Sequence, residues 1–183
     1  RLDSPLDSVL KLTDEKGTVL AANDDHEDPD AGVNTHHADS YLMFKLPADG
    51  NYYVHIGDAA RAGGPAYAYR LRLSQPQPDF ALYVVPSSIA LSSKGTNNIS
   101  IQAVRKDGFT GPITVNLKDP PDGFSLAPGT IPKDKTSARI VLKTSLTATT
   151  RPVDIVLEGR AKIDQREVSH EAVAAEDRMQ AFL

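Results

Sequence analysis

The sequence contains no cysteine and no tryptophan, and only 6% of its 183 residues are aromatic. Without cysteine the chain has no disulfide bond, no cysteine-based zinc site, no iron–sulfur cluster and no thiol nucleophile. The absence leaves the redox compartment open, because an oxidising compartment permits disulfides without requiring them. No run approaches the roughly 18 apolar residues of a membrane-spanning helix, so we expect no membrane span.

Positive charge is also sparse, and it is not clustered. Residues 1–78 hold 7 Lys and Arg against 12 Asp and Glu, and residues 79–183 hold 13 against 12, which together give the formal net charge of −4. A nucleic-acid interface needs Lys and Arg gathered on one face. We therefore expect no nucleic-acid partner.

A proline-rich segment divides the chain into two parts. Residues 74–79 read SQPQPD, and two prolines alternating with glutamine cannot continue a central strand. The segment is therefore predicted to be a short, stiff linker between domains at residues 1–75 and 79–172. Residues 173–183 are predicted to be a C-terminal tail or a short helix that begins near Glu171.

The first part reads as β-structure. Two β-prone runs, 9–13 and 18–22, flank the turn-forming residues 14–17, which predicts a hairpin. Alternating apolar residues predict further strands at 41–46, 51–56 and 66–73. In this interpretation Tyr52, Tyr67 and Tyr69 fill the core with their apolar neighbours, and Tyr53 faces outward.

The second part shows the same pattern with different spacing. Short strands with turn signals every 8 to 12 residues are typical of an immunoglobulin-like β-sandwich. The predicted strands are 80–85, 89–91, 98–104, 113–117, 124–127, 138–142, 153–157 and 168–172.

Three motifs occur in order in the first part: a D-x-x-L strand at 7–10, a G-x-x-L-A-x-N-D-D hairpin at 17–25 and a P-A-D-G-x-Y-Y-V segment at 47–54. This series resembles the bacterial pre-peptidase C-terminal (PPC) domain. The resemblance implies a small jelly-roll-like β-sandwich attached to a protease or another exported protein. Since a complete domain of this family has further strands before its D-x-x-L strand, the sequence is expected to begin inside the domain.

Two motifs of the second part, R-x-D-G-F-x-G-P at 105–112 and P-x-G-F at 121–124, resemble immunoglobulin-like repeats of exported planctomycete-type proteins. Together the two resemblances imply an all-β chain of two tandem β-sandwiches, the second immunoglobulin-like or fibronectin III-like. They imply a secreted, periplasmic or cell-surface location. Because missing strands would leave an unpaired sheet edge, self-association through that edge is expected.

The acidic loop at residues 23–30 is the one candidate metal site. Calcium takes six to eight oxygen ligands, often from a loop dense in carboxylates, and the resemblance implies calcium at the N-D-D motif in some family members. The other interpretation is a plain solvated loop, which does not have EF-hand spacing. The predicted ligands are Asp24, Asp25, Asp28, Asp7 and Asp39, with Asp3 near the same end.

The remaining chemistry-bearing residues predict no assembled catalytic site. His36 and His37, with His26 nearby, would need a turn to share a metal, since adjacent side chains on an extended chain point apart. His55 is expected to be a solvated strand residue. The sequence has no nucleophile elbow, phosphate loop or dinucleotide fingerprint.

We therefore expect a non-catalytic accessory module that spaces, stabilises or presents neighbouring domains of a larger exported protein. The alternative is a calcium-assisted module that binds a protein or a polysaccharide.

Overall fold

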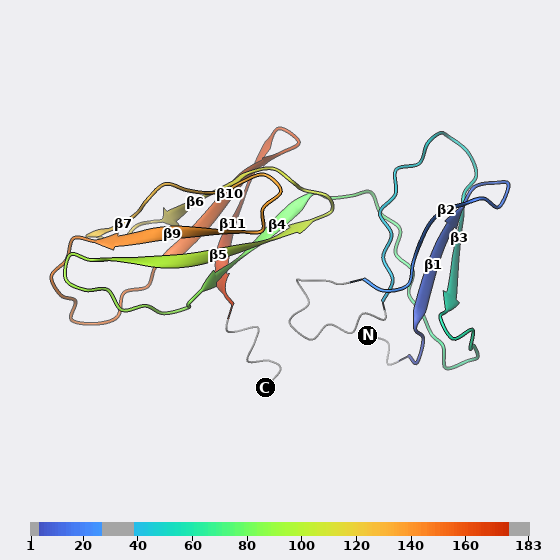
Figure 1. Cartoon of the computed structure of the whole chain (residues 1–183), viewed down its shortest axis with the longest axis horizontal. Helices are drawn as coiled ribbons and strands as arrows, with labels where there is room; N and C mark the ends of the chain where they lie inside the picture. Colours follow the sequence, from blue (N-terminus) through green and yellow to red (C-terminus); the bar gives the residue numbers. More distant parts are fainter. Residues whose placement is uncertain (1–3, 27–38, 176–183) are drawn as a thin grey trace. The chain divides into compact units, whose positions relative to one another are not determined.

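A computed structural model of the chain describes residues 4–26 and 39–175. Over these residues the fold is all-β and contains no helix, which confirms the predicted class (Figure 1). Accordingly, no described segment is a helix of the length and apolarity that a bilayer crossing requires. The chain divides into two compact units, Arg1–Pro76 and Gln77–Leu183, and the division falls within the proline-rich segment.

The first unit is built on a three-stranded antiparallel sheet. Its strands are β1 (Ser8–Thr13), β2 (Val19–Asn23) and β3 (Tyr53–Asp58), in the order β2-β1-β3. The β1–β2 hairpin was predicted, and the reason lies in its turn: Gly17 has the left-handed φ of +81° that glycine adopts without strain. Asp14 Oδ1 accepts the Thr18 N–H at 2.7 Å and the Lys16 N–H at 2.9 Å.

Two strands predicted for the first unit are not formed. Residues 41–46 and 66–73 are in no strand, because a strand needs a hydrogen-bonding neighbour and the described sheet offers these segments none. The predicted strand at 51–56 does form, shifted by two residues, as β3. Only one hydrophobic side chain of the described first unit, Leu12 on β1, is buried.

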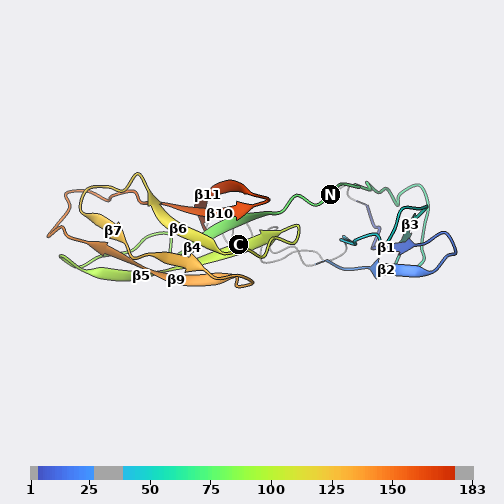
Figure 2. The same ribbon diagram turned by 90° about the horizontal axis from the view of Figure 1, so that it is seen from above.

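The second unit holds one eight-stranded sheet with the order β7-β9-β5-β4-β11-β10-β6-β8. The sheet folds over into two layers, as seen from above in Figure 2. All neighbours are antiparallel except β4 and β11, which run parallel. The strands are β4 (Asp79–Val85), β5 (Thr96–Lys106), β6 (Ile113–Lys118), β7 (Phe124–Leu126), β8 (Gly129–Ile131), β9 (Ser137–Thr144), β10 (Val156–Ile163) and β11 (Arg166–Ala174).

The core of the second unit lies between the two layers. On β5 the predicted alternation is confirmed, since Ile99, Ile101 and Ala103 are all buried. Buried residues from the strands of both layers form one core with these three side chains. Burial of this apolar surface is the main driving force for folding of the second unit. The largest buried side chains are Phe80, Leu82, Ile101, Ile113, Ile131, Leu142 and Val115.

Several boundaries in the second unit differ from the predictions. Residues 89–91 form no strand, yet Ile89 and Leu91 pack against the core as loop residues. The strand predicted at 153–157 begins only at Val156 and runs to Ile163, and β8 was missed because three residues after a proline show no periodicity. The strand predicted at 168–172 is confirmed within β11, so the alternative of a helix that begins near Glu171 is wrong at that residue.

The β10–β11 hairpin closes with a two-residue turn. Asp164 and Gln165 both have left-handed backbone conformations, with φ of 47° and 66°, between the paired residues Ile163 and Arg166. Positive φ at both central residues defines a type I′ turn, whose twist matches that of the flanking strands. The turn normally selects Asn-Gly or Asp-Gly, so Gln165 gave no hairpin signal in the sequence.

Candidate functional site

The described acidic residues that were predicted to bind calcium are not grouped as metal ligands. Asp24 Oδ1 accepts the N–H of Asp25 at 3.1 Å, and both residues are exposed. The N–H of Asp7 donates to Asp58 Oδ1 at 3.1 Å. Asp39 is exposed. In residues 4–26 and 39–175, no three His, Asp or Glu side chains are grouped to hold a metal ion. Asp28 and Asp3 lie outside the described residues, so the calcium site stays a prediction.

The histidines of the first unit make separate contacts. His26 stacks on Tyr41 with ring centroids 4.7 Å apart. His55 Nε2 lies 3.1 Å from Thr13 Oγ1 on the neighbouring strand. His55 is an exposed residue of β3, which confirms the prediction of a solvated strand residue, and this contact adds a cross-strand partner. His36 and His37 are outside the described residues.

Two carboxylates of the first unit organise turns. Asp58 Oδ2 accepts the Ala62 N–H at 2.9 Å, and Asp58 Oδ1 accepts that of Asp7. These hydrogen bonds, with that of Ala62 first, lower the pKa of Asp58, since they stabilise its charged form. The pKa of Asp14 is lowered in the same way, chiefly by the Thr18 N–H. Both carboxylates thus stabilise turns.

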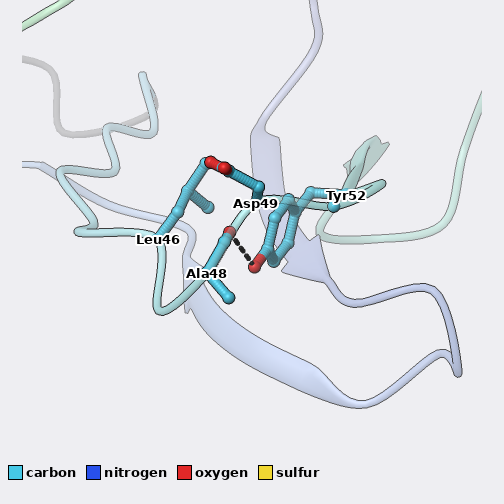
Figure 3. A pocket seen from close by; sticks show the side chains of 5 residues that line it. Leu46, Ala48, Asp49 and Tyr52 are labelled. Atoms are coloured by element: carbon cyan, nitrogen blue, oxygen red, sulfur yellow. Dashed lines mark hydrogen bonds between the residues drawn. The ribbon is translucent and has the colours of Figure 1, made fainter.

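A hollow of about 660 Å³ lies beside the turn that precedes β3, lined by Leu46, Ala48, Asp49, Gly50 and Tyr52. Figure 3 shows the Tyr52 hydroxyl pointing back to the turn, where Tyr52 Oη donates to the Ala48 carbonyl at 2.8 Å. This hydrogen bond closes the turn at residues 48–52, immediately before β3. Tyr52 therefore fixes the entry into β3.

The tyrosines were predicted to fill the core, with Tyr53 facing outward. Tyr53 is indeed 52% exposed, but the prediction is wrong for Tyr69, which is 58% exposed. The reason is the missing strand at 66–73: without a paired neighbour, the alternation of this segment has no sheet face to occupy. Tyr52 and Tyr67 are half-buried.

Arg105 on β5 binds three loop carbonyls in the second unit. Its Nη1 donates to Gly111 O at 2.6 Å, its Nη2 to Pro132 O at 2.9 Å and its Nε to Lys135 O at 2.9 Å. The guanidinium carbon also lies 5.2 Å from the ring centre of Phe109. Partial burial lowers the pKa of Arg105, and the nearby Asp134 opposes this shift. Arg105 thus joins the loops on either side of β6 and β8.

His170 and Asp79 connect the two parallel strands of the second unit. His170 Nε2 lies 2.7 Å from Asp79 Oδ1, and the His170 ring meets Phe80 edge to face with centroids 5.0 Å apart. The pair spans 91 positions of sequence, so no local motif could have predicted it. These two contacts of His170 stabilise the junction between β4 and β11.

The outer face of β6, β10 and β11 carries a cross-strand ion network. Lys118 Nζ lies 2.6 Å from Glu171 Oε1, which raises the pKa of Lys118. Arg160 Nε lies 2.7 Å from Glu158 Oε2, which lowers the pKa of Glu158 and raises that of Arg160. Glu158 and Arg160 both lie on β10, and Arg160 reaches the next strand through Nη1, which lies 3.4 Å from Glu167 Oε1 on β11. Opposite charges paired across strands, as in Lys118–Glu171 and Arg160–Glu167, stabilise a sheet. These pKa shifts therefore have structural causes.

Comparisons with family models, with curated proteins and with solved structures found no match. The sites described above are therefore interpreted from their own geometry.

Proposed function

We propose that the chain is a non-catalytic accessory part of a larger exported bacterial protein, which spaces, stabilises or presents neighbouring domains. In this proposal the first unit is a PPC-like β-sandwich and the second an immunoglobulin-like or fibronectin III-like β-sandwich. The observation that carries the proposal is the second unit's interior, which apolar side chains from both layers fill.

The layered arrangement of the second unit supports the sandwich interpretation. Two sheet layers that share one apolar core are the basis of immunoglobulin-like domains. For the first unit, the support is its antiparallel sheet, with the order β2-β1-β3, together with the sequence resemblance. The export of the parent protein is inferred from the sequence resemblance alone.

The chemistry of the described titratable groups also favours a structural role. Perturbed pKa values mark catalytic sites and structural ion pairs alike. Here every resolved shift has a structural cause: Asp14 and Asp58 stabilise turns, Arg105 joins loops, and Lys118, Glu158 and Arg160 form the cross-strand network.

The cavity inside the second unit is small for a ligand. It measures about 70 Å³ and is lined by apolar residues that include Ile99, Leu142 and Ala172, whereas ligand pockets are typically about 300–1,000 Å³. This cavity is therefore too small to hold a typical ligand, which supports a packed structural role for the second unit.

Co-sedimentation of the purified chain with insoluble polysaccharides and with collagen fibres, each with calcium or with a chelator, tests the proposal. We expect the chain to stay in the supernatant under all conditions. A reporter enzyme fused to the chain should resist protease longer than the free reporter does. Calcium-dependent retention on a polysaccharide would instead establish the alternative binding role.

A further inference from the structure

Residues 66–73, with the sequence AYAYRLRL, have the composition of a strand but pair with none of the strands within residues 4–26 and 39–175. Tyr69, Leu71 and Leu73 alternate along the segment and are 58%, 40% and 75% exposed. A half-buried strand has this period of two, with its apolar residues on the face that packs. The segment therefore has the pattern of a strand, and its alternating apolar side chains are exposed to solvent.

The backbone of this segment is also unpaired. The Tyr67 N–H donates to the Gly64 carbonyl at 3.0 Å. From residue 68 to residue 73, the described structure gives neither the N–H groups nor the carbonyls a protein partner. Consecutive free backbone donors and acceptors on an extended chain are a template for another strand.

The polar side of the segment is basic. Arg70 and Arg72 are exposed, and neither forms an ion pair within residues 4–26 and 39–175. Residues directly opposite in a strand pair interact, and opposite charges there are favourable while like charges are not. A strand that pairs with this segment is therefore best matched by carboxylates opposite the two arginines.

We propose that residues 66–73 bind an extended strand of a partner protein in which apolar and acidic side chains alternate. The partner's backbone would pair with the free groups of residues 68–73, its apolar side chains would cover Tyr69, Leu71 and Leu73, and its carboxylates would pair with Arg70 and Arg72. The proposal rests on the accessory role, which implies a protein partner, and it names the site and the chemistry of that partner.

Charge decides between this partner and a second copy of the same segment. A second copy would also offer apolar residues and free backbone groups, but residues 66–73 contain no Asp or Glu. Self-pairing would therefore leave both arginines without carboxylates and would bring four positive charges together. The complementarity acts locally, because screening limits it to about 8 Å in physiological salt.

Amide hydrogen exchange of the whole chain, measured by NMR, tests the proposal with a short peptide of alternating Val and Glu. We expect exchange at residues 68–73 to slow when the peptide is added, while the core of the second unit is unchanged. A peptide of alternating Val and Lys should give no such protection. Equal protection by both peptides, or by neither, would overturn the proposal.

Three variants test whether peptide binding is specific to this segment. Reversing both charges (Arg70→Glu with Arg72→Glu) should weaken the Val-Glu peptide about tenfold or more and create binding of the Val-Lys peptide. Arg139→Glu with Lys143→Glu makes the same change on exposed positions of β9 and should leave binding unaltered. Leu71→Pro, which removes a backbone donor that has no partner in the fold, should abolish binding while the spectrum of the second unit is retained.

The remaining outcomes distinguish failure of the proposed strand site from failure of the proposed accessory role. A concentration-dependent dimer that protects residues 68–73 without peptide would assign the segment to a second copy and overturn the acidic partner. If the Val-Glu peptide gives no protection and the chain does not co-sediment with polysaccharide or collagen, the strand site is overturned and the accessory role is not. If the chain co-sediments with polysaccharide, the accessory role is overturned, whatever the peptide result.

Discussion

Gly159 on β10 faces Leu82 on β4 across the interior of the second unit. A Cβ atom added to Gly159 would collide with the Leu82 Cδ1 and would lie 3.0 Å from the Ile113 Cγ2. The two layers thus approach each other closely because residue 159 has no side chain.

We expect Gly159→Ala to lower the free energy of unfolding of the second unit by about 1–3 kcal/mol, because the core must shift to admit one methyl group. Urea denaturation of the whole chain, followed by the β-sheet signal, measures the change. Gly57→Ala is the control, since a Cβ atom there meets no other atom within 4 Å. Equal stability of the two variants would show that the layers can separate freely.

The type I′ turn at Asp164 and Gln165 should be improved by glycine. Gln165 has a φ of 66°, which is unfavourable for a residue with a Cβ atom. Gln165→Gly is therefore expected to raise the free energy of unfolding by about 0.5–1 kcal/mol. Gln102→Gly, the same change at an exposed position of β5, should lower it by about the same amount because glycine weakens a strand interior. Thermal unfolding distinguishes the two; destabilisation by both would mean that the turn carries no strain.

Arg105 is expected not to tolerate lysine. Its planar guanidinium reaches the carbonyls of Gly111, Pro132 and Lys135 together, whereas an ammonium group cannot reproduce that fork. Arg105→Lys should lower the free energy of unfolding by about 1–2 kcal/mol and speed amide exchange in the loops around residues 109–112 and 132–135. Arg139→Lys, an exposed arginine on β9, controls for the substitution itself. If both variants behaved alike, the three bonds would be energetically unimportant.

Local sequence signals predicted the second unit better than the first. On β5 the alternation of Ile99, Ile101 and Ala103 agreed with burial because this strand has paired neighbours on both sides and a core on one face. At Tyr69 and Leu71 the same alternation failed, because periodicity records a capacity to form a strand and not the presence of a partner. Pairing is a property of the whole fold, which no local pattern contains.

The individual side-chain contacts of the structure were harder to predict from the sequence than the strands were. His170 and Asp79 lie far apart in sequence, and Arg105 appeared only as one letter of a turn motif. The hydrogen bond from Tyr52 to Ala48 spans four residues and could have been found from the turn residues at 47–50 followed by tyrosine. Asp14 could similarly be expected to accept backbone N–H groups of its turn, which is the usual role of aspartate there.

Acidification should loosen the first unit through Asp58. Because the N–H groups of Ala62 and Asp7 stabilise the ionised form, the folded-state pKa of Asp58 lies below its ordinary value of 3.8. A group with a lowered pKa contributes stability above its unfolded-state pKa and loses that contribution as the pH falls through the folded-state pKa. The turn at residues 58–62 should therefore be retained at neutral pH and should open below about pH 4.

The amide signal of Ala62, followed by NMR in the whole chain as the pH is lowered, should report this opening with a midpoint below 3.8. Asp58→Asn removes the charge and one of the two accepting oxygens, so the turn should be looser at neutral pH and its Ala62 signal should no longer show this titration. Asp49→Asn, at an exposed carboxylate on the preceding turn, should leave the Ala62 titration unchanged. If Ala62 titrated identically in the Asp58→Asn variant, another group would control the turn. A midpoint above 3.8 in the unmodified chain would mean that the two N–H groups do not favour the ionised carboxylate.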